Sequence, residues 1–213
     1  GQAWRVGVRP RQPTLWPLDL RSFHWLTPPP GAFDADPFLA HDNGKTWLFF
    51  ERWTPARSLG EIWCAPLRGD GRAGPAQLAL RLPHHLAFPQ VLRVAGQWWM
   101  VPDGGGETGV QVLRAREFPL SWQLAEVWLP GQKWVDPVVH FDGQLWWLLV
   151  TPQYGDQPSH DELHAFWSEQ WGGPWQPHAA NPVVSDVRCA RNAGRLQLRD
   201  GVWWRPAQDC GDD

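Results

Sequence analysis

The chain has 213 residues, of which 43% are apolar and 19% are charged, and its formal net charge is −3. That length suits one domain, and the apolar content can fill a core, which excludes wholesale disorder. The negative balance argues against a nucleic-acid-binding protein that depends on bulk positive charge. No stretch approaches 18 consecutive apolar residues, so no transmembrane segment is expected.

Cysteine usage and the start of the chain bear on the compartment. The three cysteines are far apart and odd in number, which argues against a disulfide framework, and no CxxC pair indicates zinc. No positively charged start leads into an apolar run, so no signal peptide is visible. These features favour a cytoplasmic protein, although the chain starts at Gly1 and the sequence does not define its native N-terminus.

A unit of about 50 residues recurs along the chain. Each copy begins near a proline, and Pro37, Pro89 and Pro137 are 52 and 48 residues apart. A proline suits the first position of a strand because no ladder donor is lost there. A Gly-containing turn and an aromatic-rich strand follow. The copies span 35–50, 88–101 and 135–149, with a weaker one at 193–204.

Further strands are expected in each unit. The third strands are predicted at 60–67, 109–115 and 161–168, and fourth strands at 77–82 and 122–129. Four-stranded units at this period predict an all-β fold, a β-propeller whose 18 tryptophans mostly fill the space between blades. We expect a single domain over 1–213, with an N-terminal strand at 3–8 and blades near 32–82, 84–129, 133–184 and 187–213. Three explanations for the incomplete last unit remain open: the chain is a fragment, the strand at 3–8 supplies a missing strand, or the last blade is degenerate.

Two sets of motifs resemble known families. Ala35-Asp36-Pro37-Phe38 and the stretch 135–143 resemble inner-strand motifs of five-bladed propellers of the arabinanase/xylosidase clan of glycoside hydrolases. A longer set resembles the propeller domain found N-terminal to the catalytic domain in glucosamine inositolphosphorylceramide transferases and in bacterial relatives. The segments that carry this second resemblance are 85–91, 100–102, 113–122, 173–183, 186–195 and 205–209.

The first resemblance implies a five-bladed propeller and an inverting hydrolase of O-glycosyl bonds. In that clan one Asp activates water, a second orients, and a Glu protonates the leaving oxygen; Asp36 matches the first and Asp136 the second. Where the clan has its Glu, this chain has Arg191 and Asn192, and neither is a general acid at neutral pH. The acid therefore stays unassigned.

Other polar residues are candidates for substrate binding or for the missing acid. Asp103 and Glu107 flank Gly104–Gly106, a run that permits close approach of a ligand, while Glu51 and Asp186 are further carboxylates. We expect each of these four to be a loop or surface carboxylate. The candidate substrate-binding residues are His84, His85, Gln90, Asp103, Glu107, Arg188 and Arg191. No metal-ligand spacing is recognisable, and no cofactor is expected.

Three functions remain open from the sequence. The first is a glycoside-hydrolase-like enzyme acting on a glycan or sugar conjugate. The second is a non-catalytic glycan-binding or scaffold domain of a glycosyltransferase or formyltransferase system, with the linked transferase domain outside this chain; its Arg-bearing fourth unit would suit an anionic or amino sugar. The third is a propeller for protein contacts. An Asp before Pro can also simply cap a turn, so Asp36 and Asp136 have a purely structural interpretation as well.

Overall fold

The computed structural model describes residues 4–11, 19–155, 157–158 and 160–211. These residues form an all-β structure whose one helical element is the short 3-10 turn η1, Leu20–Ser22. In this part of the chain no helix is long and apolar enough to cross a membrane.

The first four-stranded sheet, here called blade 1, is an antiparallel meander. Its strands run in chain order: β3 Phe33–Asp42, β4 Lys45–Trp53, β5 Gly60–Leu67 and β6 Gln77–Leu80. A short pair, β1 Gly7–Val8 and β2 His24–Trp25, precedes it. The β3–β4 turn is Asn43-Gly44, and both residues have positive φ, as a tight hairpin requires.

One long strand joins the second and third units. Strand β10, Ser121–Phe141, pairs with β9 through its first half and with β11 through its second half. Blade 2 therefore comprises β7 Ala87–Val94, β8 Gln97–Asp103, β9 Thr108–Glu117 and the start of β10. Blade 3 comprises the end of β10 with β11 Trp146–Tyr154, β13 Glu162–Ser168 and β14 Gln176–Pro177, and has β12 Gln157–Pro158 and β15 Val184–Ser185 at its margins.

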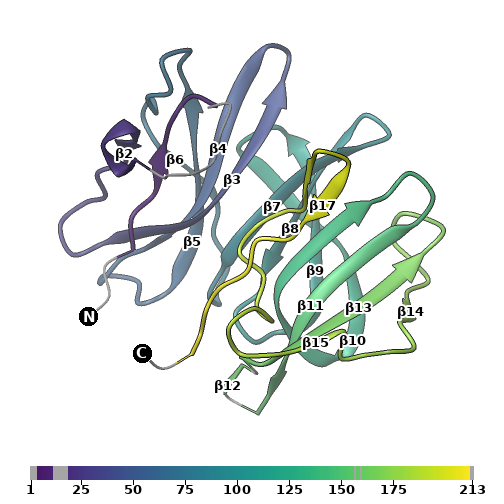
Figure 1. The fold of residues 1–213 in the computed structure, drawn as a ribbon. Helices are drawn as coiled ribbons and strands as arrows, with labels where there is room; N and C mark the ends of the chain where they lie inside the picture. Colours follow the sequence, from purple (N-terminus) through teal and green to yellow (C-terminus); the bar gives the residue numbers. More distant parts are fainter. Residues whose placement is uncertain (1–3, 12–18, 156, 159, 212–213) are drawn as a thin grey trace.

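The C-terminal segment forms only one hairpin, β16 Gln197–Arg199 with β17 Val202–Trp204. Figure 1 shows this yellow segment passing between blade 1 and blade 3. Arg195 fixes it there by donating to the carbonyl oxygens of Leu39 in β3 and Val91 in β7, at 3.0 and 2.9 Å. Among the described residues no sheet closes on itself, so the structure has three blades and a hairpin and leaves the predicted five-blade count open.

Most of the predicted strands are confirmed. Strand β5 has the predicted bounds, β9 and β13 contain or nearly match theirs, and β10 contains the strand expected at 122–129. At the N-terminus the strand covers only Gly7–Val8 of the predicted 3–8, and residue 3 lies outside the described residues. The predicted blade and domain limits remain predictions.

Apolar cores lie between successive sheets. Between blades 1 and 2, Phe49 and Ile62 pack with Met100 and Trp98. Between blades 2 and 3, Trp128 and Trp134 pack with the valines of β9 and β11. On the other face of blade 1, Val6 packs against Leu48 and Phe50. Large aromatic side chains therefore fill the interblade space, as the sequence predicted, and they fix the blades relative to one another.

The Gln90 side chain in blade 2 is hydrogen-bonded to the backbone of blade 3. Its buried amide donates to the Val139 carbonyl oxygen at 2.8 Å and accepts from the Val139 N–H at 2.7 Å. Gln90→Ala leaves both backbone groups without partners, so the free energy of unfolding should fall by roughly 2 kcal/mol or more. Urea unfolding measures this, with the exposed Gln144→Ala as control; equal midpoints for the two variants would contradict the assignment.

Candidate functional site

The same backbone irregularity occurs in the inner strand of each blade. The ladder shifts register between Ala35 and Phe38 in β3, between Ala87 and Gln90 in β7, and between Val135 and Val138 in β10. The bulged residues Asp36, Phe88 and Asp136 have φ of 50, 48 and 49°. Such φ values are strained for residues other than glycine, at a cost of about 1–3 kcal/mol each. The bulge also removes these residues' N–H groups from the ladder.

In blades 2 and 3, a carboxylate from the preceding blade accepts a hydrogen bond from the N–H group of the bulged residue. Asp36 Oδ2 accepts from the Phe88 N–H at 3.2 Å, and Asp103 Oδ2 accepts from the Asp136 N–H at 3.2 Å. Asp103 Oδ1 also accepts from the Gly105 N–H at 2.7 Å. A buried N–H without a partner would be costly, so these two carboxylates have a structural task.

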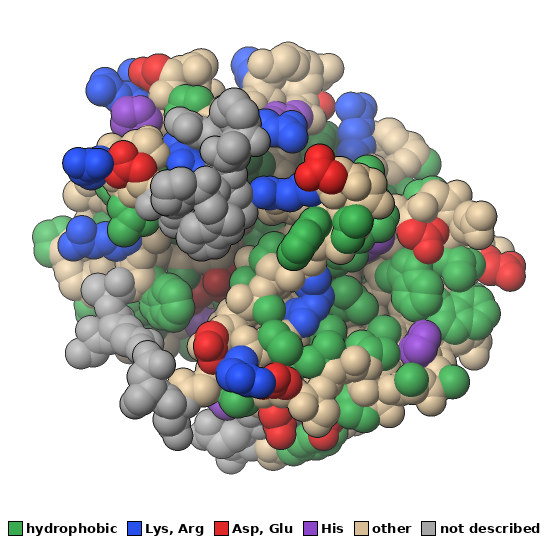
Figure 2. All heavy atoms as spheres, viewed as in Figure 1, with side chains coloured by type: hydrophobic (Ala, Val, Ile, Leu, Met, Phe, Trp, Pro, Cys, Tyr) green, Lys and Arg blue, Asp and Glu red, His purple; other side chains and the backbone are tan. Residues whose placement is uncertain are grey.

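A polar residue also recurs on the second strand of each blade. Glu51, Asp103 and Thr151 lie opposite the residue that precedes each bulge. Each follows its bulge residue by fifteen positions, from 36 to 51, from 88 to 103 and from 136 to 151. Glu51 and Asp103 thereby join Asp36 and Asp136 in one group of four side chains, the carboxylate cluster. In the space-filling view, acidic and histidine side chains lie within a recess between blade 1 and the C-terminal segment (Figure 2).

Burial raises the pKa values of the cluster. Glu51, Asp103 and Asp136 are only 5, 6 and 3% exposed. Loss of hydration raises the pKa of Asp36 to about 6 against the opposing hydrogen bond from Phe88. Burial, and then the neighbouring carboxylates, raise the pKa of Glu51 to about 8. The Asp36 and Glu51 carboxyl groups lie close together, and their interaction lowers the pKa of Asp36 and raises that of Glu51.

Arg191 is the cation of the cluster. Its Nε and Nη2 donate to Asp136 Oδ2 at 2.8 and 2.6 Å, and Gln208 Nε2 donates to the same oxygen at 3.1 Å. Burial raises the pKa of Asp136 to about 7, and the Arg191 charge opposes that rise. The fully buried Asn192 donates to the Asp136 carbonyl oxygen at 2.8 Å. The C-terminal segment is therefore fastened to blade 3 at the cluster itself.

His85 forms one wall of the cluster. Its Nδ1 accepts from the Gly60 N–H at 2.9 Å, and its Nε2 lies 3.5 Å from Glu51 Oε1. Burial lowers the pKa of His85, so the ring is neutral and its one proton is on Nε2, facing Glu51. A Cβ at Gly105 would lie 2.6 Å from the His85 Cβ, so only glycine fits there.

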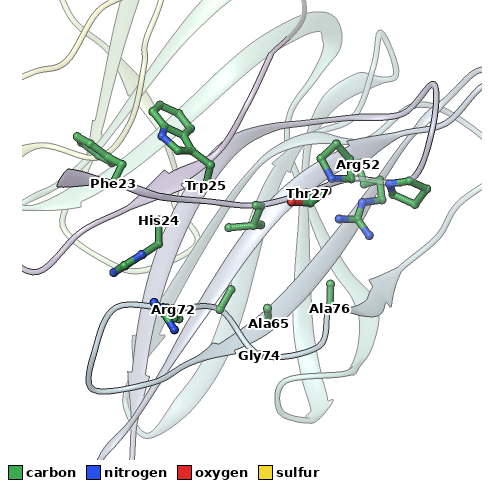
Figure 3. Close-up of a pocket in the computed structure, with 13 residues that line it drawn as sticks. Phe23, His24, Trp25, Thr27, Arg52, Ala65, Arg72, Gly74 and Ala76 are labelled. Carbon is green, nitrogen blue, oxygen red and sulfur yellow. The ribbon is translucent and has the colours of Figure 1, made fainter. Parts of the chain in front are cut away.

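A cavity also lies away from the cluster. It occupies about 740 Å³ between the β2 segment and blade 1, where Arg52, Arg72 and Ala65 line it (Figure 3). Arg52 follows Glu51 in β4 and points to the opposite face, where Asp34 accepts from it at 2.6 and 2.8 Å. This cavity is thus separated by the blade 1 sheet from the carboxylate cluster. In the described part of the chain no group of three His, Cys, Asp or Glu side chains has an arrangement that could hold a metal ion.

Comparison with known proteins identifies the family of this chain. Residues 26–213 match the family described as "Glucosamine inositolphosphorylceramide transferase 1, N-terminal". The chain belongs to this family.

Two curated relatives carry that family name in full. The chain is 35% identical over 188 residues to glucosamine inositolphosphorylceramide transferase 1 of Arabidopsis thaliana, covering 86% of this chain and 24% of the relative. It is 32% identical over 206 residues to the protein of the same name from Oryza sativa subsp. japonica, covering 92% of this chain and 27% of the relative. The chain thus spans about a quarter of the length of these relatives.

Solved structures show the fold. An exo-1,5-α-L-arabinanase from a bovine ruminal metagenomic library has a TM-score of 0.58 at 15% identity, covering 81% of this chain and 66% of the enzyme. Zg3597, a family 117 glycoside hydrolase of Zobellia galactanivorans, has a TM-score of 0.56 at 16% identity, covering 85% of this chain and 68% of the enzyme. This family member therefore has the fold of β-propeller glycoside hydrolases.

The structure brings together five of the residues proposed from the sequence: Asp36, His85, Asp103, Asp136 and Arg191. Glu51 belongs with them, and its expected place on the surface was wrong, as was the loop or surface environment expected for Asp103. Sequence analysis named Glu51 as a further carboxylate that could replace the missing acid, but did not place it beside Asp36. The fifteen-residue offset from the Asp-Pro motif would have identified it.

The other four proposed residues lie outside the cluster or have other contacts. His84 is next to it, with Nδ1 3.0 Å from the His85 carbonyl oxygen and Nε2 3.3 Å from Gln111 Nε2. Gln90 has the structural contacts with Val139 described above. Arg188 is exposed and pairs with Asp186 at 2.8 Å, and Glu107 is exposed on the loop after Gly106.

The raised pKa values predict a pH dependence of stability. A carboxyl group whose pKa is higher in the folded than in the unfolded state stabilises the fold at low pH, and this contribution is lost as the pH rises through the folded value. For Glu51 that window runs from about 4.5 to about 8. Glu51→Gln should therefore reduce the loss of unfolding free energy between pH 5 and pH 8 by about 3 kcal/mol.

Urea unfolding at the two pH values measures this difference. The exposed Glu107→Gln is the matched control and should keep the wild-type pH dependence. A Glu51→Gln variant with the wild-type slope would show that Glu51 ionises in the folded protein as it does in water.

Proposed function

We propose that the carboxylate cluster binds a sugar or sugar conjugate, and that Asp36 and Glu51 are the groups that contact it. The observation that supports this choice is how the carboxylate oxygens are used. The chain itself occupies both oxygens of Asp103, and Arg191 and Gln208 occupy Asp136 Oδ2. Asp36 uses only Oδ2, which accepts from the Phe88 N–H, and Glu51 has His85 Nε2 at 3.5 Å as its nearest donor among the described residues. Within the same ranges neither carboxyl group is paired with an arginine, so both keep acceptor capacity for a ligand.

The charge of the cluster favours a neutral or amino sugar over an anionic one. The cluster has four carboxyl groups and one guanidinium, which is already paired with Asp136, and the neighbouring His85 is neutral. An anionic sugar would meet Asp36 without a compensating cation. Sugar hydroxyl groups donate to carboxylates, and an ammonium group would add a charge-assisted bond. The curated relatives are named for glucosamine, an amino sugar, which agrees with this electrostatic preference.

Geometry favours binding over hydrolysis. In most glycosidases the two catalytic carboxyl groups are separated by about 5–5.5 Å for retention or by about 6.5–9.5 Å for inversion. The proximity of Asp36 raises the pKa of Glu51, which favours adjacent carboxyl groups over a pair spaced around a glycosidic bond. Arg191 stands where the acid is expected and neutralises Asp136 instead.

Hydrolysis of a glycosidic bond is the second candidate. It is favoured by the separation of the pKa values, about 6 for Asp36 and about 8 for Glu51, which leaves a base and an acid side by side at neutral pH. In this alternative Asp36 activates water, and a movement of Glu51 away from Asp36 would be required first.

The domain would work within a longer protein. Since the chain spans about a quarter of the relatives, we expect a transferase domain in the same polypeptide to act on the sugar conjugate that this domain holds. The bound conjugate would thus be delivered to chemistry performed elsewhere.

Asp36→Asn tests the binding site. On an array of neutral and amino-sugar glycans, the variant should bind the wild-type hits at least about tenfold more weakly, because a charge-assisted acceptor is lost. Asp70→Asn, an exposed aspartate in the β5–β6 loop, is the control and should bind as the wild type does. Equal binding by the wild type and Asp36→Asn would disprove the assignment.

The same samples separate the two candidate functions. Each hit is incubated with the protein and followed by mass spectrometry. Release of a free sugar by the wild type, but not by Asp36→Asn, would replace the binding proposal with hydrolysis. Unchanged glycan after prolonged incubation supports binding alone.

A further inference from the structure

A second polar cleft lies on blade 2, away from the carboxylate cluster. It occupies about 380 Å³, within the usual size range of small-molecule pockets. Its lining residues come from strands β8, β9 and the first half of β10, whereas the bulge residues of the cluster lie on β3, β7 and the second half of β10. The residues are Trp99, Arg114, Gln123, Leu124, Ala125 and Glu126.

Strand register places the polar side chains beside an aromatic ring. Trp99 of β8 is directly opposite Arg114 of β9, and Arg114 is directly opposite Gln123 of β10. Residues opposite one another in a ladder project from the same face, so these three form one row across the sheet. The ladder then shifts between Leu124 and Glu126, which adds Glu126 at the end of the cleft.

Hydrogen bonds hold the side chains of Gln123 and Glu126 in place, and each keeps one polar group without a partner among the described residues. Gln123 Oε1 accepts from Arg116 Nε at 2.7 Å, which fixes the amide with its NH₂ group unpaired. Glu126 Oε2 accepts from Trp128 Nε1 at 2.7 Å, which leaves Oε1 as an acceptor. Arg114 is exposed, and no residue in the described ranges forms an ion pair with it.

The aromatic ring is also held in place. The Trp99 and Trp171 ring centroids are 5.3 Å apart, and Trp171 in turn contacts Trp128 and Trp146 at 5.0 Å each. Trp99 is half-buried by this packing. A ring supported from behind keeps its orientation at little entropic cost when a ligand packs against it.

We propose that this cleft is a second contact site for a saccharide. The apolar C–H face of a pyranose ring packs against an indole, and its hydroxyl groups both donate and accept at its edge. Arg114 and the Gln123 amide supply donors, and Glu126 Oε1 supplies an acceptor. One cation and one carboxylate balance each other, so the cleft suits a neutral sugar residue, in contrast to the acidic cluster. The site rests on its own residues and does not require ligand binding at the carboxylate cluster.

The test follows Trp99 directly by NMR. The indole N–H signal of Trp99 is identified as the one missing from the spectrum of Trp99→Phe. Methyl glucoside, methyl galactoside and methyl xyloside are then titrated to millimolar concentrations into the wild-type protein. At least one of them should shift the Trp99 signal in a saturable manner.

Variants assign the shift to this cleft. Arg114→Ala should weaken the affinity measured at Trp99 about tenfold, because a hydrogen bond from a charged donor is lost, and Gln123→Ala should weaken it as well. Lys45→Ala, an exposed cation on blade 1, and Asp36→Asn in the cluster should leave it unchanged.

Two results would overturn the proposal. One is that none of the three glycosides shifts the Trp99 signal. The other is a shift that survives Arg114→Ala and Gln123→Ala but disappears in Asp36→Asn, since that pattern would mean binding at the cluster alone. Because the two sites are read through different variants, failure of one leaves the other testable.

Discussion

The bulge in each inner strand is the constraint on which the site depends. A residue with positive φ leaves the ladder in β3, β7 and β10, and its N–H group loses its strand partner. Asp36 and Asp103 accept from the N–H groups of Phe88 and Asp136, so each of these two bulges requires an acceptor from the preceding blade, and here that acceptor is a carboxylate. Asp36 and Asp103 therefore have a structural role set by backbone geometry, and ligand chemistry can use only the capacity that this role leaves over.

The C-terminal segment limits the electrostatic cost of that arrangement. Buried carboxylates repel one another and lose hydration, and both effects raise the pKa values of Asp36 and Glu51. Arg191, Gln208 and Asn192 reach Asp136 from outside the three blades. Removing this segment would leave Asp136 as a buried charge with no cation, so the three blades and the segment form one electrostatic unit.

Sequence patterns predicted the repeating architecture better than the site. Proline spacing and turns such as Asn43-Gly44 depend on local backbone geometry, and local geometry is visible in a single sequence. The pairing of Asp136 with Arg191 depends on a contact across 55 positions that no local pattern encodes. Glu51 could be found only by comparing the units at a fixed offset of fifteen residues from the bulge. Gln90 was a candidate for substrate binding, but its side-chain amide is hydrogen-bonded to the backbone of Val139 in the neighbouring blade.

The carboxylate cluster and the blade 2 cleft differ in how much they reduce the free energy of unfolding. The cleft of blade 2 uses exposed or half-buried side chains, so its hydrogen-bonding groups stay hydrated when empty and add little strain. The cluster holds its carboxyl groups away from water with raised pKa values, and the folded state bears that cost at neutral pH. A ligand donor that binds Asp36 and Glu51 would stabilise their ionised forms and so relieve part of this cost, and that relief adds to its binding free energy. Strain that binding relieves is a reason for a protein to retain such a cluster, whereas an inert structural bulge could be satisfied by a neutral acceptor.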